Sequence, residues 1–388
     1  MTTHLSADDI LANARRLVPE LWKRARETAQ LRRVPSDLAA KIREAGVNRI
    51  CFPESWGGAE MPLPQQIELM EVLAYGDPSA AWAAKINSDA GGFAALLDPT
   101  AARELFPSVD YGVAGQGGPN GRAVVVPGGY RVTGRWSFGS GSHSADVLMA
   151  GCLVVDDSGN PVAPERLMVL APASGFQIED TWYTHGLAGS GSHHYSTKDL
   201  FVPAHHIIPV QFGAAHFDGP LYSDPILVTL TTPTVGVVLG LMKRAIEVGC
   251  EQAQKKVISI PPPSRNLKDL PRAHTAIARA EMLYGAARSY VYDSINRYWD
   301  ECSDSASASA EAIQQVALSR LNAVRAAPEV ARLLLDMVGA PAVYDEVPLA
   351  RLLRDADTIR QHHANTDDFL EVFGRARLAG AALGSPLG

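Results

Sequence analysis

The hydrophobic pattern over the start of the chain is that of helices. After Ser6, which is followed by two acidic residues, apolar side chains recur three and four positions apart as far as residue 21, and this predicts a capped amphipathic helix. Further helices are predicted over residues 36–45, 64–73 and 79–97, because segments rich in Pro, Gly and Asp separate these runs. We therefore expect an N-terminal helical domain over residues 1–110.

The pattern changes to short β-branched runs between residues 111 and 215. Val124–Val126 and Val147–Val155 are two of these runs, and turn formers such as Pro127-Gly128-Gly129 separate them. Short strands divided by turns are typical of a small antiparallel sandwich or barrel. A β domain over residues 111–215 is the expectation.

Helical spacing of apolar residues returns over residues 216–388. It predicts long helices near residues 235–246, 271–300 and 349–363, and another that begins near Glu311. Four long helices behind a sheet favour an antiparallel four-helix bundle. The predicted fold is mainly α with a β middle domain.

Two details of this last part follow from local composition. The Ser- and Ala-rich residues 302–310 are expected to form an exposed loop. Pro328 should break or kink the helix that contains it, because proline lacks the backbone N–H that a helix interior requires.

Charge and cysteine usage narrow the class of function. The formal net charge is −7, and Lys and Arg are interspersed with Asp and Glu, so neither nucleic acid nor a membrane surface is an expected partner. The four cysteines form no Cys-x-x-Cys pair, which favours reduced thiols over disulfides or a zinc site. The N-terminus has no apolar signal segment, and no run of about 18 apolar residues follows, so we expect a cytoplasmic protein.

Several catalytic signatures are absent from the sequence. It contains no His-Glu-x-x-His, no Gly-x-x-x-x-Gly-Lys-[Ser/Thr] and no Gly-x-Ser-x-Gly. The glycine clusters at residues 115–121 and 186–191 lack the strand–turn–helix context of a dinucleotide site. A dedicated NAD(P)H-binding domain is therefore not expected.

Three segments carry a longer pattern. They are Gly134–His143; Trp182–Ser192 with the strand end Asp199–Pro203; and Arg351–Ala356, which leads to His362–Asn365. Together they resemble the acyl-CoA dehydrogenase superfamily, and within it the flavin-dependent monooxygenase branch that includes the oxygenase components of two-component aromatic hydroxylases. The resemblance covers nearly the whole chain, and the second segment is its most specific part.

The resemblance implies the same three-part fold but not the dehydrogenase reaction. In acyl-CoA dehydrogenases the Arg-Asp-Ala segment runs on to a tyrosine and a catalytic glutamate, and these positions are His362 and His363 here. Other dehydrogenases carry the glutamate on the first bundle helix, where this chain has Leu230. Both carboxylate positions are empty, and α-proton removal beside a thioester needs such a base. Ordinary dehydrogenase activity is not expected.

A histidine in the C-terminal segment suits the monooxygenases better. In these relatives a histidine lies near the substrate hydroxyl, and the count matches it to His362. An imidazole with a pKa of about 6.5 can accept a proton near neutral pH. His363 is also assigned to substrate binding. If the segment is helical, His363 would point elsewhere than His362, because neighbours on a helix diverge by about 100°. The alternative is that both are surface or interface histidines.

The remaining site assignments are also implied by the resemblance. Ser140 is matched to the hydroxyl that faces the flavin N5 edge, and Ser142 follows it on the same face of an extended segment. Trp82 is assigned to the substrate pocket, although a core tryptophan is an equal reading. The other cofactor-binding candidates are Gln116, Trp136, Gly189, Ser190, Gly191 and Ser192.

No metal site is assigned. The adjacent pairs His193–His194 and His205–His206 are interpreted as structural or interfacial, because a metal usually draws its ligands from one face of several segments.

The sequence thus predicts a monooxygenase that uses FADH2 or FMNH2 and O2. A separate flavin reductase would supply the reduced flavin, and a flavin C4a-hydroperoxide would hydroxylate a small phenolic or indolic substrate. A homotetramer is expected from the resemblance. The segment Lys255–Arg265 lacks the Arg-x-x-Phe-Gly that grips FAD in dehydrogenases, so FAD and FMN both remain open.

Three alternatives stay beside this hypothesis. The same scaffold could oxidise nitrogen or sulfur, it could be a dehydrogenase with its base elsewhere, or it could bind flavin without catalysis.

Overall fold

The computed structural model describes residues 5–156, 158–209, 213–223, 225–305 and 307–379. Six helices form the N-terminal part: α1 (Ala7–Leu31), α2 (Ser36–Glu44), α3 (Leu63–Gly76), α4 (Pro78–Ser88), α5 (Ala90–Ala95) and α6 (Pro99–Leu105). Ser6 caps α1 as expected, since its hydroxyl accepts from Asp9 N–H and the Asp9 carboxylate bonds back to it. Asp77 caps α4 by accepting from Ser79 N–H.

A seven-stranded sheet forms the middle part. Its strands are β1 (Val113–Val126), β2 (Gly129–Gly139), β3 (Val147–Val155), β4 (Pro161–Pro172), β5 (Gln177–Glu179), β6 (His193–Pro203) and β7 (Ile207–Pro209), in the order β5-β6-β2-β1-β3-β4-β7. The prediction of an antiparallel sheet is wrong for one pair, because β1 and β3 run parallel. The segment between β2 and β3 carries the chain past the hairpin, so that β3 adds to the free side of β1.

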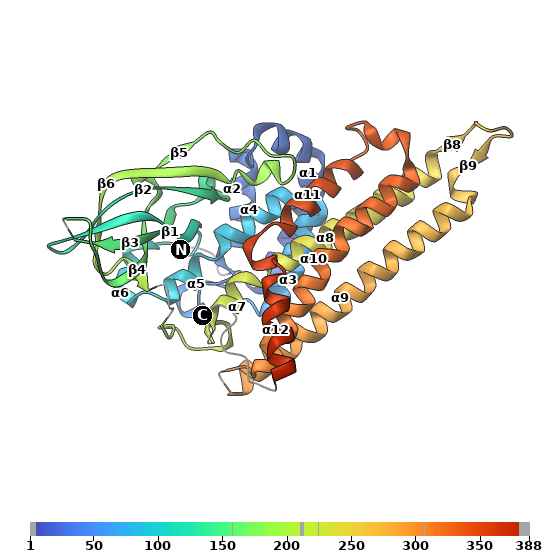
Figure 1. Cartoon of the computed structure of the whole chain (residues 1–388). Helices are drawn as coiled ribbons and strands as arrows, with labels where there is room; N and C mark the ends of the chain where they lie inside the picture. Colours follow the sequence, from blue (N-terminus) through green and yellow to red (C-terminus); the bar gives the residue numbers. More distant parts are fainter. Residues whose placement is uncertain (1–4, 157, 210–212, 224, 306, 380–388) are drawn as a thin grey trace.

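The C-terminal part is helical. It contains α7 (Ile226–Thr231), α8 (Thr234–Lys255), α9 (Pro271–Ser305), α10 (Ala310–Val338), α11 (Leu349–Arg360) and α12 (Asp368–Ala379). A two-stranded hairpin, β8 (Val257–Ile258) with β9 (Arg265–Asn266), joins α8 to α9. Figure 1 shows the sheet at one end of the molecule, this hairpin at the other, and the N-terminal helices between the sheet and the long helices.

Two sequence predictions for this part are wrong in part. Residues 303–305, 307, 309 and 310 are exposed as expected, residue 306 lies outside the described residues, and a kink at Pro328 stays a prediction. Residues 302–305 belong to α9, and Cys302 is buried at 2% exposure. The Ser303 and Ser305 hydroxyls bond the carbonyls of Trp299 and Glu301 one turn back, which lets a serine-rich stretch stay helical. The helix α10 runs through Pro328 without a break, because the packing of its apolar face outweighs one lost backbone hydrogen bond.

The apolar core is continuous between the first and last helices. Buried side chains of α1, α3, α4, α8, α9, α10 and α11 form one cluster, while the sheet has its own core. The stretch Ile226–Lys255 is long and apolar enough to cross a membrane, but its apolar window is 83% buried inside the protein, which is the environment of a core helix. The boundaries expected near residues 110 and 215 lie between the three groups of elements, and division into independent domains remains a proposal.

Candidate active site

Trp82 brings three distant parts of the chain together. It lies on α4, and its indole N–H donates to Ser140 Oγ at 3.2 Å, at the loop that follows β2. Its ring packs edge-on against the imidazole of His362, with 5.3 Å between ring centroids. Three residues assigned to the site from sequence therefore lie in direct contact, and they come from the N-terminal helices, the sheet and the C-terminal segment.

Three serine hydroxyls form a chain of hydrogen bonds that begins at Ser140. Ser140 Oγ lies 2.6 Å from Ser192 Oγ, which lies 2.8 Å from Ser190 Oγ. All three residues are buried, and the backbone N–H of Gly141 donates to the Ser190 carbonyl at 3.0 Å. The nearby Ser142 is also buried, and its hydroxyl has no partner among the described residues. The glycine–serine loop thus packs against the end of β2.

The Arg-Asp-Ala segment on α11 fixes this loop. The carboxylate of Asp355 accepts from Leu187 N–H at 2.7 Å, and the Arg354 guanidinium donates to the His185 carbonyl at 2.9 Å. Gly186 lies so close to α11 that a Cβ there would sit 2.0 Å from the Arg354 carbonyl oxygen. The second and third sequence segments are therefore two sides of one contact, which orients the serines.

Two buried carboxylates under this contact have unusual proton affinity. Asp77 and Asp355 each lie 3.8 Å from the Arg351 guanidinium, and each has one carboxylate oxygen without a hydrogen-bond partner among the described residues. Burial raises the pKa of Asp77 to about 7, against the opposing effect of Arg351. Burial also raises the pKa of Asp355. One arginine is shared between two carboxylates, so their charges are only partly compensated.

His362 lies beyond the end of α11, not within it. Its backbone is extended, with φ −63° and ψ 136°, and it caps the short 3₁₀ turn His363–Asn365. The premise that His362 and His363 diverge as helical neighbours is therefore wrong, and their ring centroids are only 4.2 Å apart. His362 is half-buried while His363 is exposed. His362 is thus the imidazole that contacts Trp82.

The environment of His362 keeps its ring neutral. Burial, together with the charges of His363, Lys85 and Arg320, lowers the pKa of His362 to about 3, and burial lowers the pKa of His363 as well. Nδ1 of His362 accepts from Ala364 N–H at 3.3 Å. A neutral ring whose Nδ1 accepts carries its proton on Nε2. The ring is therefore arranged to donate a hydrogen bond through Nε2.

One of the two cofactor-binding candidates on the sheet is contradicted by its burial, and the assignment of the other stays a prediction. Trp136 is fully buried in the core of the sheet, where its N–H donates to the Gly151 carbonyl and its ring stacks on Tyr195. Direct contact between this indole and a flavin is therefore no longer expected. Gln116 is half-buried, and its side-chain oxygen accepts from Gly118 N–H. It stays close to the β1 backbone.

Sequence reasoning missed the aromatic residue that does lie at the surface. Phe138 is 64% exposed, has φ +62°, and packs edge-on against Trp182 at 6.1 Å. The pairing of β2 with β6 is irregular between Trp136 and Gly139, which turns Phe138 outward two residues before Ser140. The repeated Gly and Ser of this stretch were the signal for such an irregularity.

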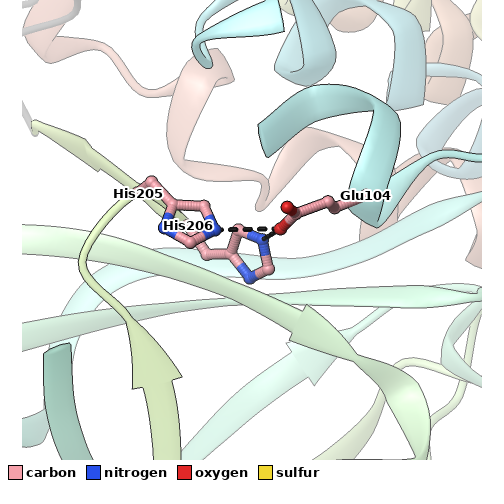
Figure 2. A group of neighbouring side chains, drawn as sticks. All are labelled: Glu104, His205 and His206. Atoms are coloured by element: carbon pink, nitrogen blue, oxygen red, sulfur yellow. Dashed lines mark hydrogen bonds and ion pairs between the residues drawn. The ribbon is translucent and has the colours of Figure 1, made fainter. Parts of the chain in front are cut away.

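The adjacent histidine pairs have local partners. Nδ1 of His193 accepts from the backbone N–H groups of Thr181 and Trp182. His205 and His206 both direct Nε2 at one carboxylate oxygen of Glu104 on α6, at 2.9 and 3.1 Å (Figure 2). Two imidazoles and a carboxylate have the donor set of a divalent metal site, but the Glu104–His205–His206 group shares no residue with the Trp82 contact. It ties α6 to the turn between β6 and β7.

Comparison with known proteins places this geometry in a family. Residues 6–100 match the family model "Acyl-CoA dehydrogenase, N-terminal domain", and residues 234–367 match "Acyl-CoA dehydrogenase, C-terminal domain". Indole-3-acetate monooxygenase of Pseudomonas putida is 32% identical over 85% of this chain and 84% of its own length. The oxygenase subunit HsaA of a flavin-dependent monooxygenase from Mycobacterium tuberculosis is 30% identical over 92% of each chain.

Solved structures agree. The HsaA monooxygenase from M. tuberculosis superposes with a TM-score of 0.87 at 26% identity, covering 99% of this chain and 100% of that one. A 3-HSA hydroxylase from Rhodococcus sp. RHA1 gives a TM-score of 0.89 at 25% identity, covering 98% and 99%. With the carboxylate positions of the dehydrogenases occupied by Leu230 and His363, the chain belongs to the flavin-dependent monooxygenases of the acyl-CoA dehydrogenase superfamily.

Proposed function

We propose that this chain is the oxygenase component of a two-component monooxygenase that hydroxylates a small aromatic substrate. Reduced flavin, as FADH2 or FMNH2, would come from a separate reductase. The observation that carries the proposal is the contact of Trp82 with both Ser140 and His362. The names of two relatives support it, one an indole-3-acetate monooxygenase and the other the oxygenase component of a p-hydroxyphenylacetate 3-hydroxylase, 24% identical over 96% of this chain.

The residues around Ser140 fit a flavin. The buried Ser142 hydroxyl has no partner among the described residues, and Ser140, Ser190 and Ser192 present further hydroxyls beside it. Such groups suit the polar edge of an isoalloxazine ring, and the exposed face of Phe138 suits its apolar surface. When bound, the reduced flavin would supply the electrons and activate oxygen.

The chain's own residues would position and protect the reacting groups. Ser140 would offer a hydroxyl to the flavin edge, while Trp82 holds that hydroxyl and excludes water with its ring. His362, neutral and protonated on Nε2, would donate a hydrogen bond toward the reacting oxygen. To act instead as the base that removes a phenolic proton at Nε2, the neutral ring would have to carry its own proton on Nδ1 and so give up the bond from Ala364 N–H.

The decisive experiment supplies the purified chain with reduced FMN or FAD, isotopically labelled oxygen and a panel of aromatic substrates. Mass spectrometry of the products is the readout. We expect one labelled oxygen atom in a ring-hydroxylated product with at least one substrate. Release of hydrogen peroxide alone with every substrate would contradict the proposal.

Two further measurements separate the alternatives. Reduction of bound oxidised flavin by an acyl-CoA without oxygen would favour a dehydrogenase with a relocated base. Labelled oxygen on nitrogen or sulfur of a heteroatom substrate would favour the other monooxygenase chemistry. Light scattering during gel filtration tests the proposed homotetramer.

A further inference from the structure

Arg320 is a buried cation without a carboxylate partner. It lies on α10 and is 5% exposed. Its Nη1 donates to Thr231 Oγ1 at 3.0 Å and its Nη2 to the Ala364 carbonyl at 2.9 Å, while Nε has no partner among the described residues. No ion pair joins the guanidinium to a carboxylate in the part of the chain that the structure describes. Two neutral oxygens are all that compensate a full charge.

Such an arrangement is costly for folding alone. An unpaired buried charge is unfavourable by several kcal/mol after relaxation. Burial lowers the pKa of Arg320 to about 10, so the group still carries its charge at neutral pH. A methionine or leucine on the same helix face would fill the space without this cost. An anion from outside the described chain would compensate the charge of this guanidinium.

A second buried cation lies next to the first. Lys85, one turn after Trp82 on α4, pairs with Asp89 at 2.7 Å and donates to the carbonyl of Leu230. Leu230 directly precedes Thr231, the partner of Arg320. Leu230 and Thr231 at the end of α7 thus each accept from a buried cation, and within the described residues only Lys85 of the two has a carboxylate partner.

Unpaired polar atoms surround the guanidinium. Thr232 follows Thr231, and Asn365 follows Ala364, the two partners of Arg320. Thr232 Oγ1 and Asn365 Oδ1 are buried and have no hydrogen-bond partner within the described residues. A bound group with both acceptor and donor capacity would satisfy several of these atoms together.

The Arg320 guanidinium lies near the residues proposed to contact the substrate. The Ala364 carbonyl lies two residues beyond His362, Lys85 lies one helical turn from Trp82, and the charges of both cations act on the His362 imidazole. Ser140 contacts the N–H of the indole, whereas His362 packs against its ring. A small aromatic molecule beside Trp82 and His362 could thus point a side group toward Arg320 while its ring stays near Ser140.

We propose that Arg320 binds a carboxylate on the aromatic substrate, and that the substrates of this site are aryl-carboxylic acids such as arylacetates. This inference rests on the proposed function. Nε and Nη2 form the edge of a guanidinium that matches a carboxylate with two parallel hydrogen bonds. The carboxylate would take Nε and would replace the Ala364 carbonyl on Nη2, which requires the turn His363–Asn365 to shift outward. Arg320 is then a specificity-determining residue and takes no part in the oxygen chemistry.

The test compares an acid with its neutral amide. Binding of indole-3-acetate and indole-3-acetamide to the full chain, and of phenylacetate and phenylacetamide, is measured by titration calorimetry without flavin. Wild-type protein should bind each acid at least about tenfold more tightly than its amide, which corresponds to about 1.4 kcal/mol. Arg320→Gln should remove that preference, and Arg320→Lys should keep part of it. Binding of an acid no more tightly than its amide, including no binding of either, overturns the inference.

A purely structural role of Arg320 predicts a different result. If the guanidinium only holds the turn His363–Asn365 in place, Arg320→Gln should weaken acid and amide by the same factor, and that outcome also overturns the inference. Turnover provides the second readout, since KM should rise for the acid while kcat for the amide stays unchanged. If the wild-type protein prefers acids but transfers no oxygen to any substrate, the proposed function is contradicted while the anion site is supported.

Discussion

Trp82 and Ser140 are joined by a buried hydrogen bond across 58 positions of sequence. The indole is the donor, so the Ser140 hydroxyl is left free to direct its own proton toward Ser192 or toward a ligand. The same indole contacts His362 with its ring. One side chain thereby sets the distance between the two residues assigned to catalysis.

Trp82→Phe should uncouple oxygen use from hydroxylation. The phenyl ring keeps most of the contact with His362 but removes the donor to Ser140. We expect reduced flavin to be consumed with more hydrogen peroxide and less hydroxylated product, by about tenfold in their ratio, the upper size of effect expected for one lost hydrogen bond. Product and peroxide are quantified in the same reaction.

Ser140→Ala should act in the same direction. Ser142→Ala is the comparison variant, because Ser142 begins the 3₁₀ turn Ser142–Ser144 and does not continue the face of Ser140 as an extended segment would. If Ser142→Ala uncouples the reaction and Ser140→Ala does not, the assignment of Ser140 to the flavin edge is wrong. Flavin affinity measured alongside separates lost binding from lost coupling.

Substitutions of His362 distinguish a hydrogen-bond donor from a general base. Gln can place an amide N–H near the position of Nε2, so His362→Gln should retain a measurable fraction of hydroxylation if the ring donates. His362→Ala should lose about 10²-fold or more. Equal loss in both variants would instead favour a base. His363→Gln is the control, because its exposed ring should contribute little.

Protonation of His362 can be followed without turnover. Since burial and neighbouring cations lower the pKa of His362 to about 3, the ring should stay neutral from pH 5 to 8 in the ligand-free protein. Imidazole nitrogen shifts in NMR spectra report this state. A titration near pH 6.5, absent in His362→Gln, would contradict the expected burial.

Sequence reasoning predicted two parts of the candidate site because they are local patterns, and their role in catalysis stays a prediction. The glycine–serine loop and the Arg-Asp-Ala segment were both singled out, and the structure shows why they occur together, since Asp355 holds Leu187 and Arg354 crowds Gly186. The contact of Trp82 with His362 is a tertiary relationship that periodicity alone cannot show. Only the resemblance placed both residues near one pocket.

The misplaced residues have identifiable causes. Alternation along a strand assigns faces only while pairing is regular, and the irregularity after Trp136 exchanges the buried and exposed positions before Ser140. The parallel pairing of β1 with β3 depends on register between distant segments, which no local run specifies. Arg320 was not singled out from the sequence, although its spacing predicts a buried position. It occupies the same helical face as Val316 and Val324, where a charged residue is unusual.

The close approach of Gly186 to α11 makes a sharp prediction for stability. Gly186→Ala should destabilise the protein by about 1–3 kcal/mol, as overpacking against backbone does, and should weaken flavin binding by displacing the serines. Gly285→Ala on α9 is the matched control. A Cβ at Gly285 meets nothing within 4 Å, so it should be neutral or stabilising by about 0.5–1 kcal/mol. Denaturant unfolding measures both.

Asp77 should give the protein a pH-dependent stability of defined sign. Burial raises its pKa to about 7, above the value in the unfolded chain. The native state therefore binds more protons than the unfolded state between about pH 4 and 7, and the free energy of unfolding decreases as pH rises through that window. Asp77→Asn should flatten this decline, while the asparagine still caps α4.

Asp98 is the control of opposite sign. It caps α6 by accepting from Thr100 N–H, and that bond lowers its pKa, so its contribution is present at neutral pH and disappears as pH falls. Thermal unfolding of the Asp77→Asn variant at pH 5 and pH 8, and of the Asp98→Asn variant at pH 5 and about pH 3, makes the comparison. An unchanged slope in Asp77→Asn would show that another group, such as Asp355, carries the effect.

The separation of Arg320 from the serine loop has a consequence for how this lineage diversifies. The residues that would choose the substrate lie on α7, α10 and the turn after His362, whereas those that would hold the flavin lie on the sheet and its loops. Substitutions on α7 and α10 would therefore change the preference for acids in a descendant gene while the serines that would hold the flavin stay the same. Trp82 and His362 contact each other and would have to be kept together.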